Sequence, residues 1–397
     1  MYYSQTEYWQ AALESGMIDI ATLRAEMDMT ERKKLLTGHK IYQDKKNFWY
    51  TRLDNRLVKR TTKEAIEDLI VEYERAKAAE PTVRDVFYMF IDQKLRYGDI
   101  SKSTYDRYER DYERYIRGRE IESVRFRALT ENYLEHFIRC TIADLGLTSK
   151  AYSNLKTILR GMLLFAKGKY TDISAQAFFG DLQFSKNTFK KKILKKEEQV
   201  FSEEEIPIVT GYLHRKNNIR CLGILLAFQT GIRVGELAAI RKSDIICEED
   251  TVSIHIQRTE TKYRENGVYV TKIKEYPKSS AGDRYVFCTD KTVETIREIE
   301  ALNPDGEYLF EEHGERLCEF AFANALDWLC KSCKIPKRSM HKIRKTYGTT
   351  LIDAGVDECI ITEQMGHSDI NCTRQYYYFS TKNRDKKREQ IQSAITY

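Results

Sequence analysis

The sequence has no long uninterrupted hydrophobic run, and this argues against a membrane-spanning helix. Such a helix needs about 20 consecutive apolar residues, whereas the longest apolar-rich piece, 221–228, fits a buried helix of a globular domain. The N-terminal segment is interrupted by Glu7, Glu14 and Asp19, so it lacks the apolar centre of a signal peptide. We therefore expect a cytoplasmic protein without a membrane partner.

Cysteine is present without a disulfide or metal-ligand pattern. The nine cysteines are scattered, and their odd number argues against a complete disulfide framework. Cys330 and Cys333 form a CxxC, but with no second CxxC and no HxxxH nearby a zinc site would lack two ligands. We interpret the pair as part of an amphipathic helix at 320–334, and we expect neither a metal nor a cofactor.

A strong excess of one charge is also missing. The chain has 66 Lys+Arg against 60 Asp+Glu, a net charge of +6, so the total alone does not indicate a nucleic-acid partner. The position of the basic residues is more informative. A lysine-rich run at 186–196 has little apolar pattern, which is typical of a linker, and it could lie along a DNA backbone.

The length of 397 residues predicts two to four domains. We predict a multidomain, mainly α protein with small β elements. The predicted parts are an N-terminal region at 1–80, an all-helical module at 81–180, a basic linker at 181–200 and a mixed α/β domain at 201–397. In the first region we expect strands at 41–43, 48–52 and 57–59 and a helix at 62–78. Its interleaved aromatic and basic residues could read a DNA groove, or Phe48, Trp49 and Tyr50 could simply pack a small core.

Two patterns in 201–397 place basic residues at turns. Gly231 allows a sharp turn after a buried helix, and Arg233 follows near the start of the next helix, where the helix terminus favours an anion. We expect that helix to continue through Ile240. Lys278 opens a second turn, 278–282, which we expect to be the tip of a hairpin between strands at 269–276 and 284–287. Taken alone, an arginine beside a turn is more often in a surface salt bridge, and a hairpin lysine usually faces solvent.

Two further patterns lie nearer the C-terminus. His341 and Arg344 are three residues apart at the start of a predicted helix, so they share one face. A helix at 357–365 ends at Gly366, directly before His367, and the tyrosines at 376–378 follow on a short predicted helix. An isolated HxxR occurs by chance in many proteins, and the tyrosines could merely pack the last helix.

Taken together, the order of these patterns resembles the catalytic domain of tyrosine recombinases, the phage integrase family. Residues 81–180 look like the core-binding module of that family. The strand-plus-helix part of 1–80 looks like the arm-binding domain in integrases of conjugative transposons and some phages. The catalytic residues that the resemblance implies are Arg233, Lys278, His341, Arg344, His367 and Tyr377.

The sequence departs from the family pattern at several positions. Lys345 follows the HxxR arginine, which the family accepts, but Ser280 occupies the place of a second hairpin lysine. Relatives carry the nucleophile nine or ten residues after the histidine, which allows Tyr376 or Tyr377. The frequent Tyr-x-His ending favours Tyr377, with Phe379 in the place of the histidine.

The resemblance implies an enzyme that cleaves and rejoins double-stranded DNA through a 3′-phosphotyrosine, to integrate or excise a mobile element. It further implies a homotetramer on two DNA sites, cations supplied by the protein rather than by a metal, and an accessory excision protein as a further candidate partner. The alternatives are a Xer-like resolvase or invertase, a non-catalytic DNA-binding regulator, and a relaxing topoisomerase.

Overall fold

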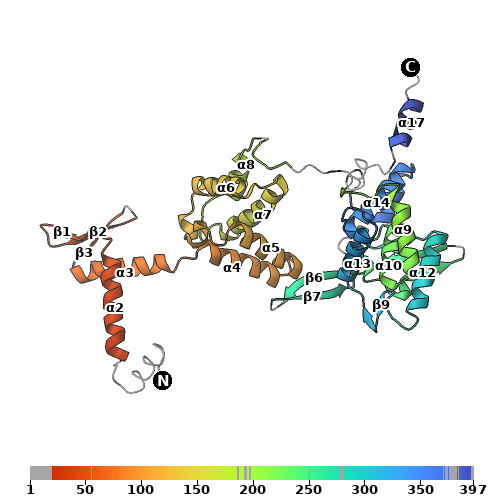
Figure 1. Cartoon of the computed structure of the whole chain (residues 1–397). Coiled ribbons are helices and arrows are strands. Elements are labelled where there is room, and N and C mark those ends of the chain that lie inside the picture. The colour runs from red at the N-terminus through yellow and green to blue at the C-terminus, as the bar shows by residue number, and fades with distance from the viewer. Residues whose placement is uncertain are drawn as a thin grey trace, which may run out of the picture. The chain divides into compact units, whose positions relative to one another are not determined.

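The computed structural model describes residues 20–394 apart from short gaps. The gaps are 55, 186, 192–194, 196–197, 250, 266, 278–279, 370, 372–373, 375–381 and 383. The chain divides into two compact units, one formed by residues up to 96 together with 111–189, the other by 97–110 together with 190–397 (Figure 1). The finer division into three domains and a linker stays a prediction. Among the described helices, none combines the length and the apolar character that crossing a membrane requires.

The first unit begins with a helix, a small antiparallel sheet of order β1-β2-β3 and a second helix. These elements are α2 (Ile20–Leu36), β1 (Tyr42–Gln43), β2 (Trp49–Leu53), β3 (Arg56–Arg60) and α3 (Lys63–Ala78). Thr62 caps α3 by accepting a hydrogen bond from the N–H of Ala65. Thr51 of β2 is buried, as are Ile66 and Ile70 of α3. The three strands and the helix predicted here are confirmed.

The remainder of the first unit is helical, as predicted. Its helices are α4 (Val83–Arg96), α6 (Glu131–Leu145), α7 (Ser149–Ala166) and α8 (Ala175–Asp181), with short 3-10 turns at Glu120–Ser123 and Phe126–Ala128. A further helix, α5 (Lys102–Tyr115), is divided between the two units after residue 110. Apolar residues at helical spacing form its core. In that core the rings of Phe87 and Tyr112 stack at 4.2 Å.

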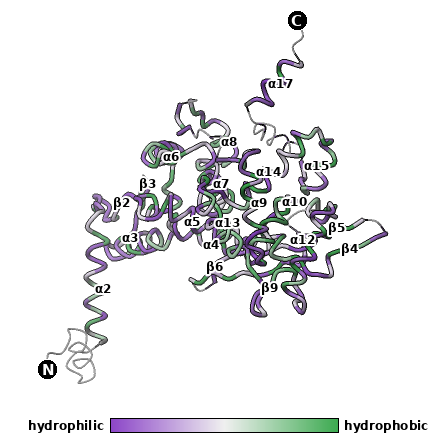
Figure 2. The backbone as a smooth tube through the Cα atoms, turned by 45° about the vertical axis from the view of Figure 1, so that its right-hand side comes forward, coloured by the Kyte–Doolittle hydropathy of each residue, from purple (hydrophilic) through white to green (hydrophobic). Residues whose placement is uncertain are grey.

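The second unit is organised around one buried helix, α10. Its helices are α9 (Glu205–Lys216), α10 (Ile219–Thr230), α11 (Val234–Leu237), α12 (Asp290–Leu302), α13 (Glu319–Ser332), α14 (Met340–Asp353), α15 (Glu358–Met365) and α17 (Arg384–Ala394). α10 is apolar on all sides, and it packs against α9, α12, α13 and α14. Along the tube of Figure 2, α17 is by contrast mostly hydrophilic.

The strands of the second unit form small antiparallel sheets. They are β4 (Ile245–Glu248), β5 (Thr251–Ile256), β6 (Thr259–Glu265), β7 (Val268–Lys274), β8 (Arg284–Phe287), β9 (Glu311–Glu312) and β10 (Glu315–Arg316). β6 and β7 form a hairpin, at whose end Glu265 pairs with Val268. The hairpin predicted around 278–282 is wrong: β7 pairs with β6, and β8 pairs with β5. The segment 275–283 therefore leads from one sheet to the other.

One smaller expectation is also corrected. The helix expected to continue through Ile240 ends at Leu237, and the carbonyl of Ile240 accepts a hydrogen bond from Leu309 N–H. Phe201 lies outside any strand, and its N–H donates to Thr346 Oγ1 at 2.9 Å. Just before α9, Ser202 Oγ accepts from the N–H of Glu205.

Candidate functional site

The turn between α10 and α11 presents Arg233. Gly231 ends α10 with φ 65°, and a Cβ there would lie 2.2 Å from the ring of Tyr347, so both the backbone angle and the space require glycine. Arg233 follows as the N-cap residue of α11. Its Nη1 donates to Glu236 Oε1 at 2.7 Å, and its Nη2 donates to the carbonyl of Gly366 at 2.9 Å. These two bonds orient a guanidinium whose side chain is still 42% exposed.

The first turns of α14 carry His341 and Arg344. Arg344 is only 2% exposed. Its Nη1 donates to the carbonyl of Gly231 at 2.8 Å, and its Nη2 donates to the carbonyl of Met365. His341 lies one turn earlier on the same helix, and part of its surface is open to solvent while the rest is covered by the protein. Arg344 thus joins the Gly231 turn to the end of α15.

His367 follows the end of α15, where Gly366 adopts the left-handed conformation with φ 59°. The last carbonyls of a helix have no partner within the helix and need other donors. Here three consecutive carbonyls accept from three arginines. Gln364 accepts from Arg284 Nε at 2.8 Å, Met365 from Arg344, and Gly366 from Arg233 at 2.9 Å. We call residues 364–366 the carbonyl turn.

Sequence reasoning assigned no role to two residues of this site, Glu236 and Arg284. Glu236 is 4% exposed, and its carboxylate accepts from Arg233 and, at 2.9 Å, from Arg284 Nη2. Arg284 occupies a buried position of β8, whose residues alternate between buried and exposed. The sequence contained two signals for these residues. Arg284 is an arginine at a buried position of a strand, and Glu236 follows Arg233 by three residues.

Burial and positive charge shift the pKa values of the ionisable groups here. Desolvation, together with Arg344, Arg233 and Arg284, lowers the pKa of His367 to about 4. Desolvation and the charges of Lys345 and Arg344 also lower the pKa of His341. For Glu236, burial opposes ionisation, but the neighbouring Arg284 and Arg233 outweigh it and lower the pKa. Three guanidinium groups against one carboxylate leave an excess of positive charge, which is suited to an anion such as a phosphodiester.

The structure therefore brings together four of the six predicted catalytic residues, Arg233, His341, Arg344 and His367. Lys278 and the tyrosines at 376–378 lie outside the described residues. Within the described segments, no group of three or more His, Cys, Asp or Glu residues is placed to hold a metal ion.

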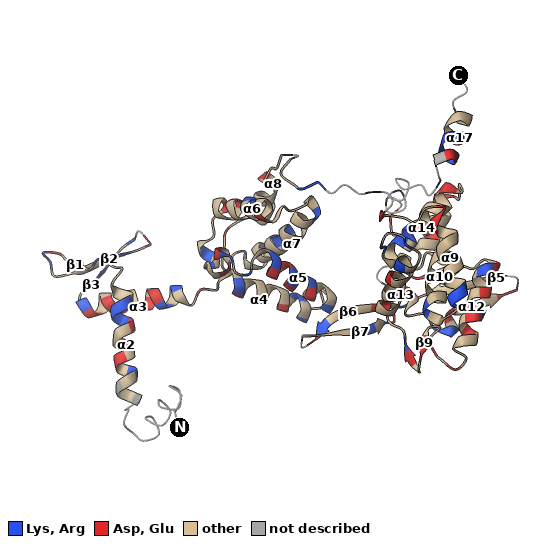
Figure 3. Cartoon of the chain, viewed as in Figure 1, with Lys and Arg blue, Asp and Glu red and all other residues tan. Residues whose placement is uncertain are grey.

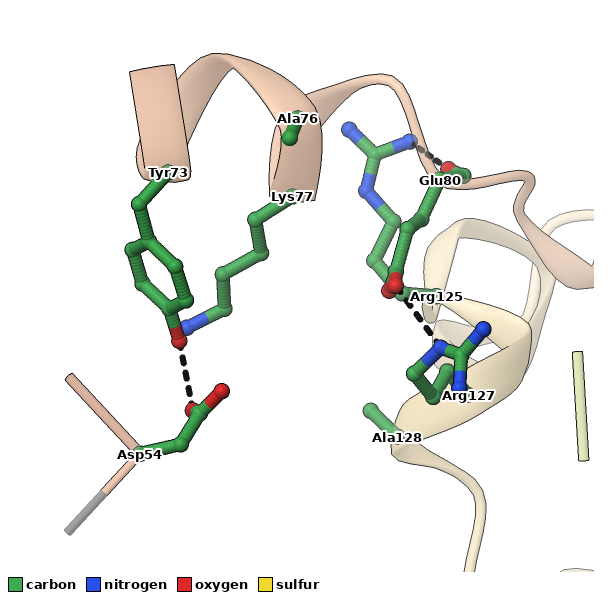
Figure 4. Close-up of a pocket in the computed structure, with 8 residues that line it drawn as sticks. All are labelled: Asp54, Tyr73, Ala76, Lys77, Glu80, Arg125, Arg127 and Ala128. Atoms are coloured by element: carbon green, nitrogen blue, oxygen red, sulfur yellow. Dashed lines mark hydrogen bonds and ion pairs between the residues drawn. The ribbon is translucent and has the colours of Figure 1, made fainter. Parts of the chain in front are cut away.

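A cavity of about 360 Å3 in the first unit has a different character (Figure 4). Several of its polar residues are bonded to one another: Tyr73 to Asp54, Arg127 Nε to the Glu80 carboxylate at 2.8 Å, and Arg125 Nη1 to the Glu80 carbonyl at 2.6 Å. The bonds of Glu80 connect the end of α3 to the segment at 125–128. We therefore interpret the residues around the cavity as structural rather than functional.

Comparisons with known proteins agree with this geometry. The model of the phage integrase family matches residues 199–384. A XerC-like tyrosine recombinase of Caldanaerobacter subterraneus subsp. tengcongensis is 25% identical over 314 residues, which is 75% of this chain and 78% of the relative. Transposase A of transposon Tn554 from Staphylococcus aureus is 24% identical over 212 residues, 49% of this chain and 52% of the relative.

Solved structures share the fold. The integrase of transposon Tn1549 in complex with transposon right-end DNA has a TM-score of 0.58 at 18% identity, covering 78% of this chain and 98% of that one. A lambda integrase dimer bound to a core site has a TM-score of 0.53 at 12% identity, covering 85% of this chain and 93% of that one. The phage integrase domain at 199–384 and the two cationic turns that converge on the end of α15 together support the identification of a tyrosine-type site-specific recombinase.

Proposed function

We propose that this recombinase is an integrase, which inserts or excises a mobile element by cutting and rejoining double-stranded DNA through a 3′-phosphotyrosine. The observation that carries the proposal is the convergence of Arg233 and Arg344 on the carbonyl turn beside His367. The similarity to a Tn554 transposase and to the fold of the Tn1549 integrase supports a mobile element as the substrate.

In the proposed reaction, Tyr377 Oη attacks the phosphorus and the bond to the 5′ oxygen breaks. One of the site histidines, His341 or His367, accepts the proton of the tyrosine, and Lys278 protonates the departing 5′ oxygen as general acid. The phosphotyrosine keeps the energy of the phosphodiester, so the attack of a 5′-hydroxyl rejoins the strand without an external energy source.

The arginines would stabilise the charge that develops on the non-bridging oxygens in the transition state. Guanidinium groups suit this contact because they bind phosphate oxygens in a bidentate manner. Arg233 and Arg344 are held by backbone carbonyls before DNA arrives, so little reorganisation is needed. His341 and His367 would hold the phosphate and transfer protons. With pKa values below the ordinary range, both are neutral near pH 7 until a phosphate adds negative charge.

Double-stranded DNA is the proposed partner, and we expect four protomers on two DNA sites. Figure 3 shows Lys and Arg on α4, α5 and α7 of the helical module, intermixed with acidic residues. On the N-terminal sheet, Phe48, Trp49 and Tyr50 are half-buried, and Lys59 lies 5.1 Å from the centre of the Phe48 ring. This mixture of aromatic and basic groups supports an arm-DNA-binding role, and an accessory excision protein remains a candidate partner.

A suicide substrate tests the proposed function and the choice of nucleophile. Such a duplex is nicked so that cleavage traps the covalent adduct. Tyr377→Phe removes only a hydroxyl, so we expect normal assembly on DNA and no adduct. Tyr376→Phe and Tyr378→Phe are the matched controls and should keep adduct formation, with the adduct located by peptide mapping. An adduct at Tyr376 would move the nucleophile by one residue, whereas no adduct at any of the three tyrosines would contradict the mechanism.

A Xer-like resolvase is the second candidate, because the XerC-like relative matches 75% of this chain. The two functions differ in their substrates. An integrase joins two different attachment sites, whereas a resolvase acts on two copies of one site. Strand exchange measured on both kinds of DNA pair distinguishes them, and plasmid relaxation without a second site would instead indicate a topoisomerase.

A further inference from the structure

Arg284 is the third arginine of the site, it is buried, and the proposed reaction does not use it. Its side chain is 4% exposed. Nε donates to the carbonyl of Gln364 at 2.8 Å, Nη1 to the carbonyl of Gly282 at 3.1 Å, and Nη2 to the carboxylate of Glu236 at 2.9 Å. One rigid guanidinium therefore joins three segments that are far apart in the sequence.

Two of these segments lead to a residue of the proposed chemistry. The carboxylate of Glu236, which accepts from Arg284, also accepts from the backbone N–H and from Nη1 of Arg233, at 3.1 and 2.7 Å. Gln364 begins the carbonyl turn that ends directly before His367. The third segment is the 3-10 turn Ser280–Gly282, which precedes β8.

Close packing supports the same role. A Cβ on Gly366 would lie 2.9 Å from both Cδ and Nη1 of Arg284 and 2.7 Å from the carbonyl oxygen of Ala281. The guanidinium is thus pressed against the carbonyl turn, and neither can shift without moving the other. Arg344 and Arg233 bond to the next two carbonyls of that turn, so a shift would reach both of them.

We propose that Arg284 is the positioning residue of this active site: it sets Arg233 through Glu236 and His367 through the carbonyl turn. This inference rests on the proposed function, since it concerns the rate of DNA cleavage. Arg284 itself does not touch the phosphate in this assignment. A lysine cannot replace it, because a single ammonium lacks the planar fork that reaches three acceptors.

The test is single-turnover cleavage of a suicide substrate by the full chain, with DNA affinity measured in parallel. For Arg284→Lys we expect DNA binding within about threefold of wild type and cleavage slower by about tenfold to a hundredfold, because displacements near 1 Å cost up to about a hundredfold. The matched control is Arg316→Lys. Arg316 also pairs with a buried glutamate, Glu260, and bonds to the carbonyl of Ala238 at 2.9 Å. The control should cleave within about threefold of wild type.

A double-mutant cycle asks whether Arg284 acts through Glu236. Glu236→Gln alone should also slow cleavage, and the double variant should be no slower than the slower single variant, since both interrupt one path. If the two substitutions slow cleavage multiplicatively in the double variant, Arg284 does not act through Glu236. If Arg284→Lys cleaves within about twofold of wild type, Arg284 is not a positioning residue. If Arg284→Lys does not fold, cleavage and DNA affinity are instead measured for Arg284→Gln and Glu236→Gln and compared with those of wild type. If the wild-type chain forms no covalent adduct, the proposed function is contradicted. If the wild-type chain forms the adduct but the folded variants do not cleave at the expected rates, only the proposed role of Arg284 is contradicted.

Discussion

Arg233 and Arg344 are proposed to act on the same phosphate, but they are held differently. Arg233 is 42% exposed in its side chain, whereas Arg344 is 2% exposed and donates to two backbone carbonyls. We expect Arg233→Ala to reduce cleavage by about a hundredfold or more while folding and DNA affinity stay near wild type, because one donor matters chiefly in the transition state.

The same change at Arg344 should affect folding as well. Arg344→Ala leaves the carbonyls of Gly231 and Met365 without these donors, and an unsatisfied buried acceptor costs about 1–3 kcal/mol. We would measure thermal unfolding and covalent-adduct formation for both variants. Both should lose adduct formation, but only Arg344→Ala should also lose stability. Cleavage by either variant within about tenfold of wild type would remove that arginine from the site.

His367 gives a pH-dependent prediction. An ordinary histidine titrates near pH 6.5, but in the folded protein the pKa of His367 is lowered to about 4. Unfolded chain would take up a proton below about pH 6.5 while the native state does not, so this group reduces stability as the pH falls from about 6.5 to 4.

Nuclear magnetic resonance of labelled histidine checks this titration directly, with His367→Gln used to assign the signal. Adding a core-site duplex should raise the pKa, because the phosphate favours the protonated ring. A midpoint near 6.5 in the free protein would contradict the description of the site as desolvated and cationic.

At the scale of elements, the end of α15 should be sensitive to a single methyl group. Gly366→Ala combines the strain of a positive φ with a Cβ 2.7 Å from the carbonyl oxygen of Ala281. The matched control is Gly355→Ala after α14, where φ is 77° and the space around the Cβ is open. We expect the control to lose only the backbone cost of about 1 kcal/mol, and Gly366→Ala to lose more stability and to cleave more slowly. Equal effects in both assays would show that the packing around Gly366 is unimportant.

The elements themselves were largely predictable from the sequence. Helices such as α7 and α10 have strong apolar periodicity, and Gly366 indicated the end of α15. β6 was missed because Thr259–Glu265 is mostly polar, and without β6 the strand β7 was assigned to the wrong partner. Pairing between strands is a long-range property, which local patterns do not contain.

Prediction of the site was limited in the same way. Arg233, His341, Arg344 and His367 could be named from their order and spacing. Arg284 could not, because two of its partners, Glu236 and Gln364, are separated from it by 48 and 80 positions in the chain. A residue that acts by joining distant segments becomes evident only when those segments are placed in space.

At the scale of the whole molecule, truncation tests the proposed arm-binding role of the N-terminal region. Glu80 fastens α3 to Arg125 and Arg127, so a fragment should begin before it. We expect a fragment from Ala79 to Tyr397 to bind a core crossover site like the full chain and to lose affinity for outlying arm sites. A fragment from Pro81 serves as the comparison, and it should bind the core site with lower thermal stability. Footprints of the first fragment and of the full chain that agree on every site would contradict the arm-binding role.

The carbonyl turn has a consequence for how this site can change over time. Main-chain carbonyls are common to all amino acids, so the three arginines bind features that do not depend on which side chains occupy 364 and 365. Those side chains can be exchanged for others of similar volume and leave the acceptors in place. The arrangement of charge is encoded in the path of the backbone, and within the turn that path depends on Gly366 with its φ of 59°.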